Sequence, residues 1–341
     1  MKLFFEDFQM KLTTIFLLLI SIIFVSEELI AQLFHNENPL VSTYSIVARD
    51  TETGEMGVAV QSHWFSVGSI VAWGEAGVGV VATQSFVNPA FGPDGIELLN
   101  SGLTAPEVVD KLIESDEGRD VRQLAIIDVN GNVKSYTGIN CIPGAGHIEG
   151  DNYSVQANLM LNEKVWGAMS LAFENSTGPL AERMLSALFA AEEVGGDIRG
   201  KQSACLLVVR GESTGKVWKD RLIDLRVEDH SEPLKELERL LKIHRAYDHM
   251  NAGDLAVELG NMELAMKEYS LAKEMFPESE EMKYWHAVAL ANSGMIEEAL
   301  PLFKDVFLKN KNWNTLTPRL VPIWLLNVTE DELNRILSIN N

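Results

Sequence analysis

The clearest structural pattern in this 341-residue sequence begins with the stretch Val41-Ser-Thr-Tyr-Ser-Ile-Val-Ala-Arg-Asp50-Thr-Glu-Thr-Gly54-Glu-Met-Gly-Val-Ala-Val-Gln-Ser-His63. Residues 43–49 and 55–62 are rich in Val, Ala and Ile, and turn residues separate them, so the stretch predicts a β-hairpin. The first strand opens with the hydroxyl side chains of Ser42, Thr43 and Ser45. These residues are either ordinary strand formers or the source of a nucleophile.

Further short strands and helices follow the hairpin in groups. Because they do not alternate one for one, their order argues against a doubly wound parallel sheet. Two pairs of helices between groups of strands suit two stacked antiparallel sheets with a helix layer on each outer face. We therefore expect an α+β domain, a four-layer α-β-β-α sandwich, over residues 42–231. Its strands are expected at 68–73, 78–84, 123–129, 133–136, 153–159, 203–209 and 222–227, and its helices near 96–99 and at 104–113, 163–174 and 179–193.

The sequence after about residue 232 has helical periodicity and an internal repeat of 34 residues. Small residues where helices cross, with aromatic residues between them, are typical of tetratricopeptide repeats. We therefore expect an all-α tetratricopeptide-like domain over residues 232–341, and two repeats alone bury too little surface, so flanking helices should cap the stack. The recurring residues are Gly260, Ala265, Tyr269 and Ala272, which return as Gly294, Ala299, Phe303 and Val306.

The first 41 residues are expected to be a signal peptide and leader. Met10 and Lys11 precede a short apolar run that ends at Val25, which is the pattern of a secretory signal. The protein is therefore predicted to be exported, either periplasmic or secreted, with membrane contact only through an uncleaved leader. The formal net charge of −21 repels phosphodiester backbones, so nucleic acid is not an expected partner.

Familiar cofactor and hydrolase motifs are missing from the sequence. The segment Gly77-Val-Gly79-Val-Val-Ala82 imitates a dinucleotide-binding fingerprint, but its valines continue a strand and no helix follows to face a pyrophosphate. The two cysteines, Cys141 and Cys205, form no CxxC pair. No cofactor and no metal ion is therefore expected.

The hydroxyl run at the first strand is the one remaining chemical candidate. A Ser or Thr hydroxyl is a weak nucleophile without a base, and the residue's own α-amino group, with a pKa of about 8, can be that base near neutral pH. Thr43 would then have to become the first residue of the mature chain. On the residues alone, strand formers without chemical importance are the competing interpretation.

Many short segments, in order from Thr43 to about His244, resemble the domain-of-unknown-function family 1028 (DUF1028). The resemblance implies the fold of N-terminal-nucleophile (Ntn) hydrolases, which is a four-layer α-β-β-α sandwich, and a candidate site without a substrate. It also suggests a homodimer. The matching segments are Thr43-Tyr-Ser-Ile-Val-Ala-Arg-Asp50, Gly57-Val-Ala-Val60, Gly77-Val-Gly79, Ala82-Thr-Gln84, Asn88-Pro89 with Gly92, Arg122-Gln-Leu124 with Asp128, Gly144 to His147, Val155-Gln with Asn158, Gln202-Ser-Ala204 and Asp224-Leu-Arg226.

In the Ntn arrangement the nucleophile starts the first strand, beside the end of the second. Antiparallel pairing should place Thr43 opposite residues 61–63, which includes Ser62. The loop from the fourth strand into the first helix should bring Gln84 and Asn88 close to Thr43, where they could hold a developing oxyanion. Asn158 is a further candidate for this role. Many active Ntn hydrolases carry a Lys or Arg near the nucleophile, but the predicted third strand, Ser69-Ile-Val-Ala-Trp73, supplies none.

Two functions are consistent with these features. The first is an exported Ntn-type amidohydrolase in which Thr43 attacks a small amide or peptide-like substrate after processing. The second is a non-catalytic protein whose sandwich holds a ligand. In either case the helical repeats could present a concave surface to a protein partner.

Overall fold

The computed structural model describes residues 40–339. Two compact units divide the chain, one up to Leu234 and one from Lys235 onward, and each is considered by itself. The predicted signal sequence lies outside the described residues. Within residues 40–339 no helix combines the length and the apolar character that a membrane span requires.

The first sheet of the N-terminal unit is antiparallel and has five strands. Its order is β1 (Leu40–Val41), β5 (Gly79–Phe86), β6 (Arg122–Asp128) and β7 (Val133–Thr137), and β4 (Ala72–Glu75) also pairs with β5. β4 and β1 pair with successive parts of β5: β4 faces Gly79 to Ala82, and β1 faces Ser85 and Phe86. The residues just before the predicted nucleophile are therefore part of this sheet.

The second sheet is antiparallel and contains the predicted hairpin at its centre. Its six strands run in the order β11 (Arg221–Val227), β10 (Ser203–Val209), β3 (Met56–Ser62), β2 (Thr43–Arg49), β9 (Tyr153–Ala157) and β8 (Gly146–Gly150). Six of the seven residues of β2 and all of β3 are buried, which fits strands with neighbours on both sides and on both faces.

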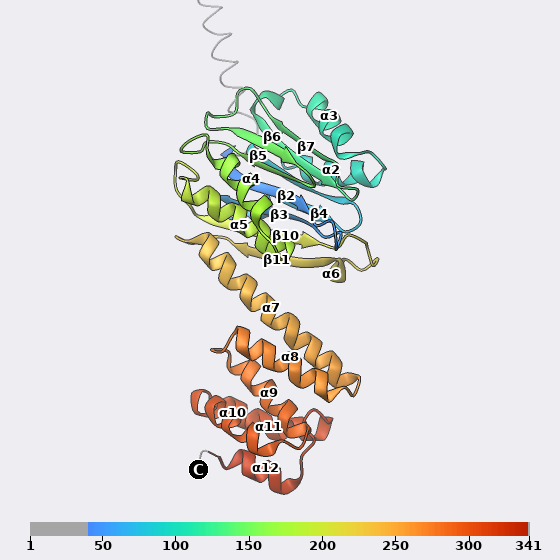
Figure 1. The fold of residues 1–341 in the computed structure, drawn as a ribbon, viewed down its shortest axis with the longest axis vertical. Coiled ribbons are helices and arrows are strands. Elements are labelled where there is room, and N and C mark those ends of the chain that lie inside the picture. Colours follow the sequence, from blue (N-terminus) through green and yellow to red (C-terminus); the bar gives the residue numbers. More distant parts are fainter. Residues whose placement is uncertain (1–39, 340–341) are drawn as a thin grey trace, which may run out of the picture. The chain divides into compact units, whose positions relative to one another are not determined.

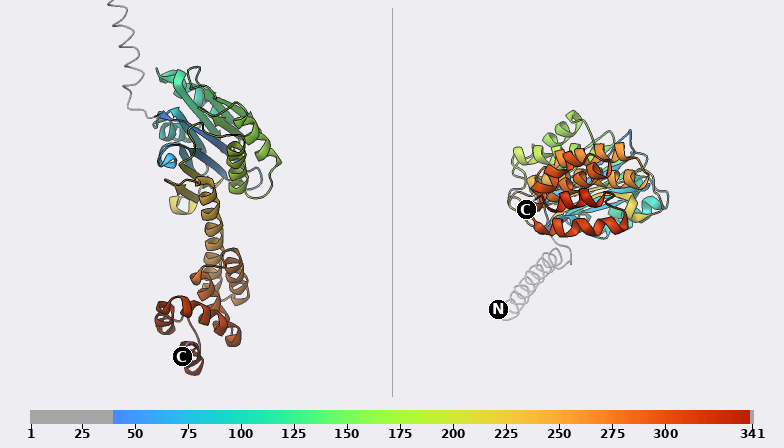
Figure 2. Two further views of the ribbon diagram at one scale, coloured as in Figure 1. Left: turned by 90° about the vertical axis from the view of Figure 1, so that its left-hand side faces the viewer. Right: turned by 90° about the horizontal axis from the view of Figure 1, so that it is seen from below.

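Helices cover the two sheets on opposite sides. α2 (Phe91–Asn100) and α3 (Ala105–Ser115) contact strands of the first sheet, and α4 (Val165–Asn175) and α5 (Leu180–Glu193) contact strands of the second. Strands β2, β3 and β9 contact β5 and β6 across the interior. The stacked layers of this unit are seen in Figures 1 and 2. The prediction of a mixed α+β domain with two antiparallel sheets is confirmed. Short helical turns η1 (Val67–Ser69), η2 (Arg119–Val121) and α6 (Val217–Asp220) connect these elements.

Two local predictions were wrong. The expected strand at 68–73 begins only at Ala72, because Ser66 adopts a left-handed φ of 57° and the Ser203 hydroxyl accepts the Val67 N–H, which holds the chain in a helical turn. The expected strands include none between 136 and 153, but the Gly-containing residues 146–150 form edge strand β8 against β9. Its low intrinsic β-propensity is outweighed by pairing with a neighbouring strand.

The C-terminal unit is helical throughout. It comprises most of α7 (Pro233–Glu258), α8 (Met262–Met275), α9 (Glu280–Asn292), α10 (Ile296–Lys309), α11 (Lys311–Leu320), η3 (Val321–Ile323) and α12 (Glu330–Leu337). The recurring glycines, Gly260 and Gly294, have positive φ at the ends of helices, where a side chain would be strained. The other recurring positions are all buried: Ala265, Tyr269, Ala272, Ala299, Phe303 and Val306. The 34-residue periodicity thus marks the helix ends and the core of this unit.

Candidate functional site

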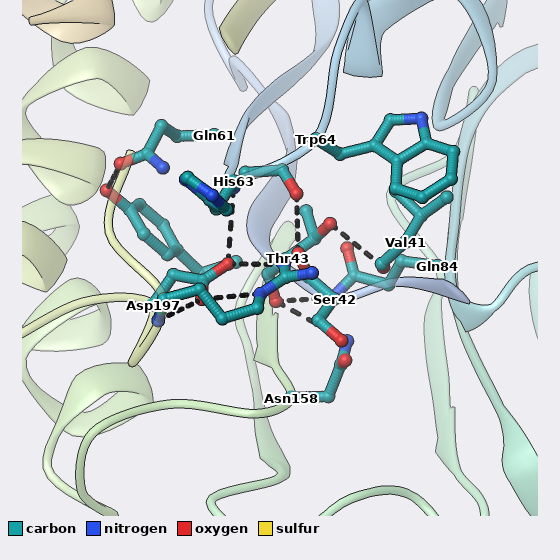
Figure 3. Close-up of polar contacts among 12 residues, drawn as sticks. Val41, Ser42, Thr43, Gln61, His63, Trp64, Gln84, Asn158 and Asp197 are labelled. Carbon is teal, nitrogen blue, oxygen red and sulfur yellow. Dashed lines mark hydrogen bonds and ion pairs between the residues drawn. The ribbon is translucent and has the colours of Figure 1, made fainter. Parts of the chain in front are cut away.

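Thr43 is the first residue of β2 and is fully buried. Antiparallel register places it opposite Ser62, as the hairpin predicted. The Thr43 hydroxyl donates to the carbonyl oxygen of Val41 at 3.0 Å, so it points back along the segment that precedes it (Figure 3). The hydroxyl therefore lies on the side of the chain where the Ser42–Thr43 peptide bond would have to break.

The carbonyl oxygen of Ser42, which belongs to that peptide bond, accepts two side-chain hydrogen bonds. One comes from the Ser62 hydroxyl, and the other from Nη2 of Arg199 at 2.8 Å. Both donors are aimed at the atom that would carry negative charge if the bond were attacked. Such a pair of fixed donors is what an oxyanion hole requires.

Asp197 holds Arg199 in this position. Its carboxylate accepts from Arg199 Nε at 3.0 Å and from Nη2 at 2.7 Å, and it also accepts the Arg199 backbone N–H. Its other bond, from the backbone N–H of His63 at 3.2 Å, ties the loop to the end of β3 (Figure 3). The Asp197 side chain is fully buried whereas that of Arg199 is 27% exposed, so the pair lies at the margin of the interior.

The carbonyl oxygen of Thr43 is held by a second set of donors. It accepts the backbone N–H of Asn158 at 3.0 Å, Nδ2 of Asn158 at 3.4 Å and Nε2 of Gln84 at 3.2 Å. Gln84 and Asn158 thus contact Thr43 itself, whereas the donors on the preceding carbonyl are Ser62 and Arg199. The sequence predicts Gln84 or Asn88 as donors to a developing oxyanion, whereas the Ser42 carbonyl oxygen accepts from Ser62 and Arg199.

Gln123 joins Gln84 to Asn158 between the two sheets. Its Oε1 accepts from Gln84 Nε2 at 2.6 Å and from Asn158 Nδ2 at 3.0 Å, and its own amide donates to the Ala157 carbonyl at 2.9 Å. Ser45 extends this network, since its hydroxyl donates to Gln84 Oε1 at 2.6 Å. A buried polar layer from β2, β5 and β6 and from Asn158, just after β9, therefore fixes the start of β2.

His147 lies at the far end of the same network. Gln123 Nε2 lies 2.9 Å from the Thr137 hydroxyl, which in turn lies 2.8 Å from His147 Nδ1. Burial lowers the pKa of His147, and the nearby Glu149 opposes this effect. The neutral imidazole is therefore favoured, and its distance from Thr43 along the network makes it a structural group.

Asn88 is the one predicted site residue that the structure leaves apart from Thr43. Its Oδ1 accepts the backbone N–H of Ala90 at 3.2 Å, and its carbonyl accepts the N–H of Phe91 where α2 begins. Among the described residues, Asn88 has no hydrogen bond to Thr43. Thr43, Ser62, Gln84 and Asn158 are brought together, and Asn88 shapes the turn into α2.

Two buried polar atoms at the Ser42–Thr43 bond have no partner in the described part of the chain: Ser42 Oγ and Asn158 Oδ1. A buried polar atom without a hydrogen bond costs free energy, so each one calls for a reason. Their common location suggests that the interior here is arranged for more than packing.

Arg199 and Asp197 were missed in the sequence. They stand in the run Gly195-Gly-Asp-Ile-Arg-Gly200, in which three glycines with positive φ enclose an acid and a base. The predicted third strand, residues 69–73, carries no Lys or Arg, and the cation beside Thr43 comes from this loop instead. An acidic and a basic residue enclosed by glycines could have indicated a functional loop. No local pattern connects this loop with Thr43, which lies more than 150 positions earlier in the sequence.

The described residues hold two free cysteines and no cluster of metal-ligating side chains. No group of three or more His, Cys, Asp or Glu side chains within residues 40–339 is placed to hold a metal ion. Cys141 and Cys205 are free and buried, and burial raises the pKa of Cys205 to about 12, which keeps its thiol protonated.

Comparison with known proteins places this chain in a family. A family model described as a family of unknown function, DUF1028, matches residues 43–237. The chain belongs to the DUF1028 family. The DUF1028 match begins at Thr43 and covers both sheets from β2 onward together with their helices.

Two solved structures are similar to this DUF1028 chain. The first is the crystal structure of a DUF1028 protein from Silicibacter pomeroyi, which is 30% identical with a TM-score of 0.54; the alignment covers 59% of this chain and 88% of that one. The second is Anbu (ancestral beta-subunit) from Yersinia bercovieri, at 14% identity and a TM-score of 0.29, over 58% of this chain and 92% of that one. That second likeness is too low to argue from. No curated protein showed significant similarity.

Proposed function

We propose that this protein is an exported amidohydrolase of the Ntn type, in which Thr43 becomes the mature N-terminus and acts as the nucleophile. The observation that carries the proposal is the Ser42 carbonyl oxygen, which is held by Ser62 and Arg199 next to the Thr43 hydroxyl. The two helix-covered sheets would be the four layers of an Ntn sandwich. Two side-chain donors, one of them a cation, therefore converge on the oxygen that would gain charge if this bond were attacked.

The first step would be a self-cleavage. Thr43 Oγ1 attacks the Ser42 carbonyl carbon, and Ser62 Oγ and Arg199 Nη2 hold the oxygen as it gains charge. When the C–N bond breaks, the hydroxyl proton passes to the leaving nitrogen, so an ester joins Ser42 to the Thr43 side chain. Water then hydrolyses this ester, which releases a Ser42 carboxylate and a free Thr43 amine and hydroxyl.

The second step would be turnover of an external amide. The freed amine serves as the base for the adjacent hydroxyl, and the positive charge of Arg199 lowers the pKa of that amine because it disfavours a second cation nearby. The donors that held the Ser42 oxygen would then face the substrate carbonyl. Gln84 and Asn158 keep the Thr43 backbone in place throughout.

The C-terminal helices would form a tetratricopeptide-like stack over residues 232–341 that presents a surface to a protein partner. The burial of the recurring positions and the positive φ of both recurring glycines support this. The proposed catalytic domain then covers 42–231, and the leader 1–41 directs export. A homodimer is compatible with this organisation.

The test is the mature N-terminus. Intact mass and terminal sequencing of the exported wild-type protein should show a chain that begins at Thr43. Thr43→Ala should retain the bond between residues 42 and 43, and Thr43→Ser should restore cleavage. Ser203→Ala is the matched control, because it removes a buried hydroxyl from β10 that bonds Trp64 and Val67 and does not touch the Ser42 carbonyl. An intact Ser42–Thr43 bond in the wild-type protein would overturn the proposal and leave the ligand-binding function.

A further inference from the structure

Residues 40–42 directly precede the proposed cut and are called the leader in this subsection; they lie at the edge of β5, and their removal would leave a groove there. β4 covers one part of the β5 edge, and β1 covers the remaining part with the pairs Leu40–Phe86 and Val41–Ser85. If the chain were cut after Ser42, β1 would no longer be covalently attached to β2. Its departure would expose backbone N–H and C=O groups of β5 beside the new N-terminus.

The groove has a distinct environment for each leader residue. Val41 is fully buried in an apolar cluster with Val67 and Val87, and the Trp64 ring packs against this cluster (Figure 3). Ser42 is also fully buried, with its carbonyl on Ser62 and Arg199. Leu40 is only half-buried. The surroundings of the leader are therefore apolar at Val41 and polar at Ser42, beside the bond proposed to break.

Two features indicate that this groove serves a ligand. Ser85 has a left-handed φ of 72°, which is costly for a residue with a side chain and is concentrated at functional sites. The buried Asn158 Oδ1 also has no partner in the part of the chain that the structure describes. An incoming polar group could satisfy this atom, which the leader leaves unpaired.

We infer that the leader Leu40-Val-Ser42 is a built-in substrate mimic, and that the mature site takes the acyl side of an extended peptide with a small polar residue at the cleaved bond and a β-branched aliphatic residue before it. The inference rests on the proposed cleavage. A peptide is favoured over a fatty acyl amide because the two pairs with β5 use backbone amide groups, which an alkyl chain lacks.

The test measures binding rather than catalysis. A chain that begins at residue 43 and carries Thr43→Ala is produced by removing an N-terminal fusion partner, and its binding is measured by calorimetry and thermal melting. The probes are N-acetyl-Leu-Val-Ser, N-acetyl-Leu-Asp-Ser, N-acetyl-Leu-Val-Phe and N-octanoyl-serine, all as free acids. We expect the first probe to bind at least about tenfold more tightly than the others, because a carboxylate, a large ring or an alkyl chain does not fit the vacated positions.

Two full-length proteins test occupancy of the groove by the leader. The full chain with Thr43→Ala should not bind N-acetyl-Leu-Val-Ser, because its leader fills the groove. Adding Val41→Asp should expel the leader and restore binding, which keeps the test valid even if the shortened chain fails to fold. Equal binding of all probes, or binding that the intact leader does not block, would overturn the inference. If the peptide binds selectively but the wild-type chain is never cut, the proposed function fails and the groove assignment stands.

Discussion

Arg199 Nη2 donates a hydrogen bond to the carbonyl oxygen of Ser42 at 2.8 Å, between residues 157 positions apart in the chain. This contact places a fixed positive charge on the one carbonyl whose attack would make Thr43 an N-terminal residue. The Asp197 carboxylate forms an ion pair with the Arg199 guanidinium, so the positive charge is held in place before any reaction begins. Fixed donors of this kind lower a barrier because they need no reorganisation during the reaction.

The first prediction concerns this charge. Arg199→Met keeps the aliphatic stem and removes every donor, so cleavage at Ser42–Thr43 should slow by about 10²–10³-fold. Arg199→Lys should recover part of the rate, since it restores charge without the forked geometry. The measurement is the fraction of cleaved chain over time by intact mass. Arg221→Met, at an exposed pair with Asp224, is the control and should leave the rate unchanged. Cleavage at the wild-type rate in Arg199→Met would remove Arg199 from the mechanism.

The second prediction separates Ser62 from its neighbour in the sheet. Ser62→Ala removes the other donor on the Ser42 carbonyl and should slow cleavage by a similar factor of about 10²-fold or more. Ser203 lies opposite Ser62 on β10, but its hydroxyl bonds to Trp64 and Val67. Ser203→Ala should therefore lower the melting temperature without changing the cleavage rate. Cleavage of both variants at the wild-type rate would show that Ser62 has a packing role only.

A third prediction distinguishes the two asparagines. Asn158→Ala removes the side-chain donor from the Thr43 carbonyl and should slow both cleavage and any later turnover, because the nucleophile loses its fixed position. Asn88→Ala changes a turn before α2 and should affect only stability, by about 1 kcal/mol or less. Parallel mass spectrometry and thermal melting provide both readouts. A cleavage defect in Asn88→Ala as large as that in Asn158→Ala would contradict this assignment.

The buried amides should also be coupled in stability. Gln123→Leu leaves the amides of Gln84 and Asn158 without their shared acceptor, which should lower the free energy of unfolding by about 1–3 kcal/mol. In the double variant with Gln84→Leu, the total loss should be smaller than the sum of the single losses, because one broken bond is counted twice. Denaturant titration of the four proteins gives the interaction free energy. Strict additivity would mean that the two side chains act independently.

The last prediction is a pH dependence of the C-terminal unit. His286 is 8% exposed, its Nδ1 has no partner among the described residues, and burial with a smaller effect of Lys273 lowers its pKa to about 4. An unfolded chain takes up this proton near pH 6.5. The folded unit should therefore lose stability as pH falls from about 6.5 to about 4, by at most about 3 kcal/mol.

Melting of the helical unit as a function of pH tests this. His286→Phe should flatten the decline, whereas His244→Gln, which changes a less buried histidine on α7, should keep it. The sign is decisive: a unit that gains stability as the pH falls through this window would exclude a buried neutral His286.

The hairpin, the two antiparallel sheets and the helical C-terminal region could be predicted from sequence because their signals are local. Alternating strand residues around a turn specify the pairing of Thr43 with Ser62, since both lie within one hairpin. The recurring residues at a 34-residue period likewise mark helix ends and buried positions within neighbouring helices. Edge strand β8 escaped prediction because its glycines form a strand only when β9 supplies the pairing partner.

The sequence by itself determined which residue begins β2 and which residues neighbour it in the hairpin, because backbone pairing and side-chain alternation act over short separations. Only the tertiary structure decided which groups converge on the Ser42 carbonyl and that Asn88 stays apart. Arg199 reaches that oxygen through a loop held by Asp197, and the amide layer forms only when the two sheets meet. The physical reason is that hydrogen bonds and burial depend on distance in space, which the folded sheets set and the order of residues does not.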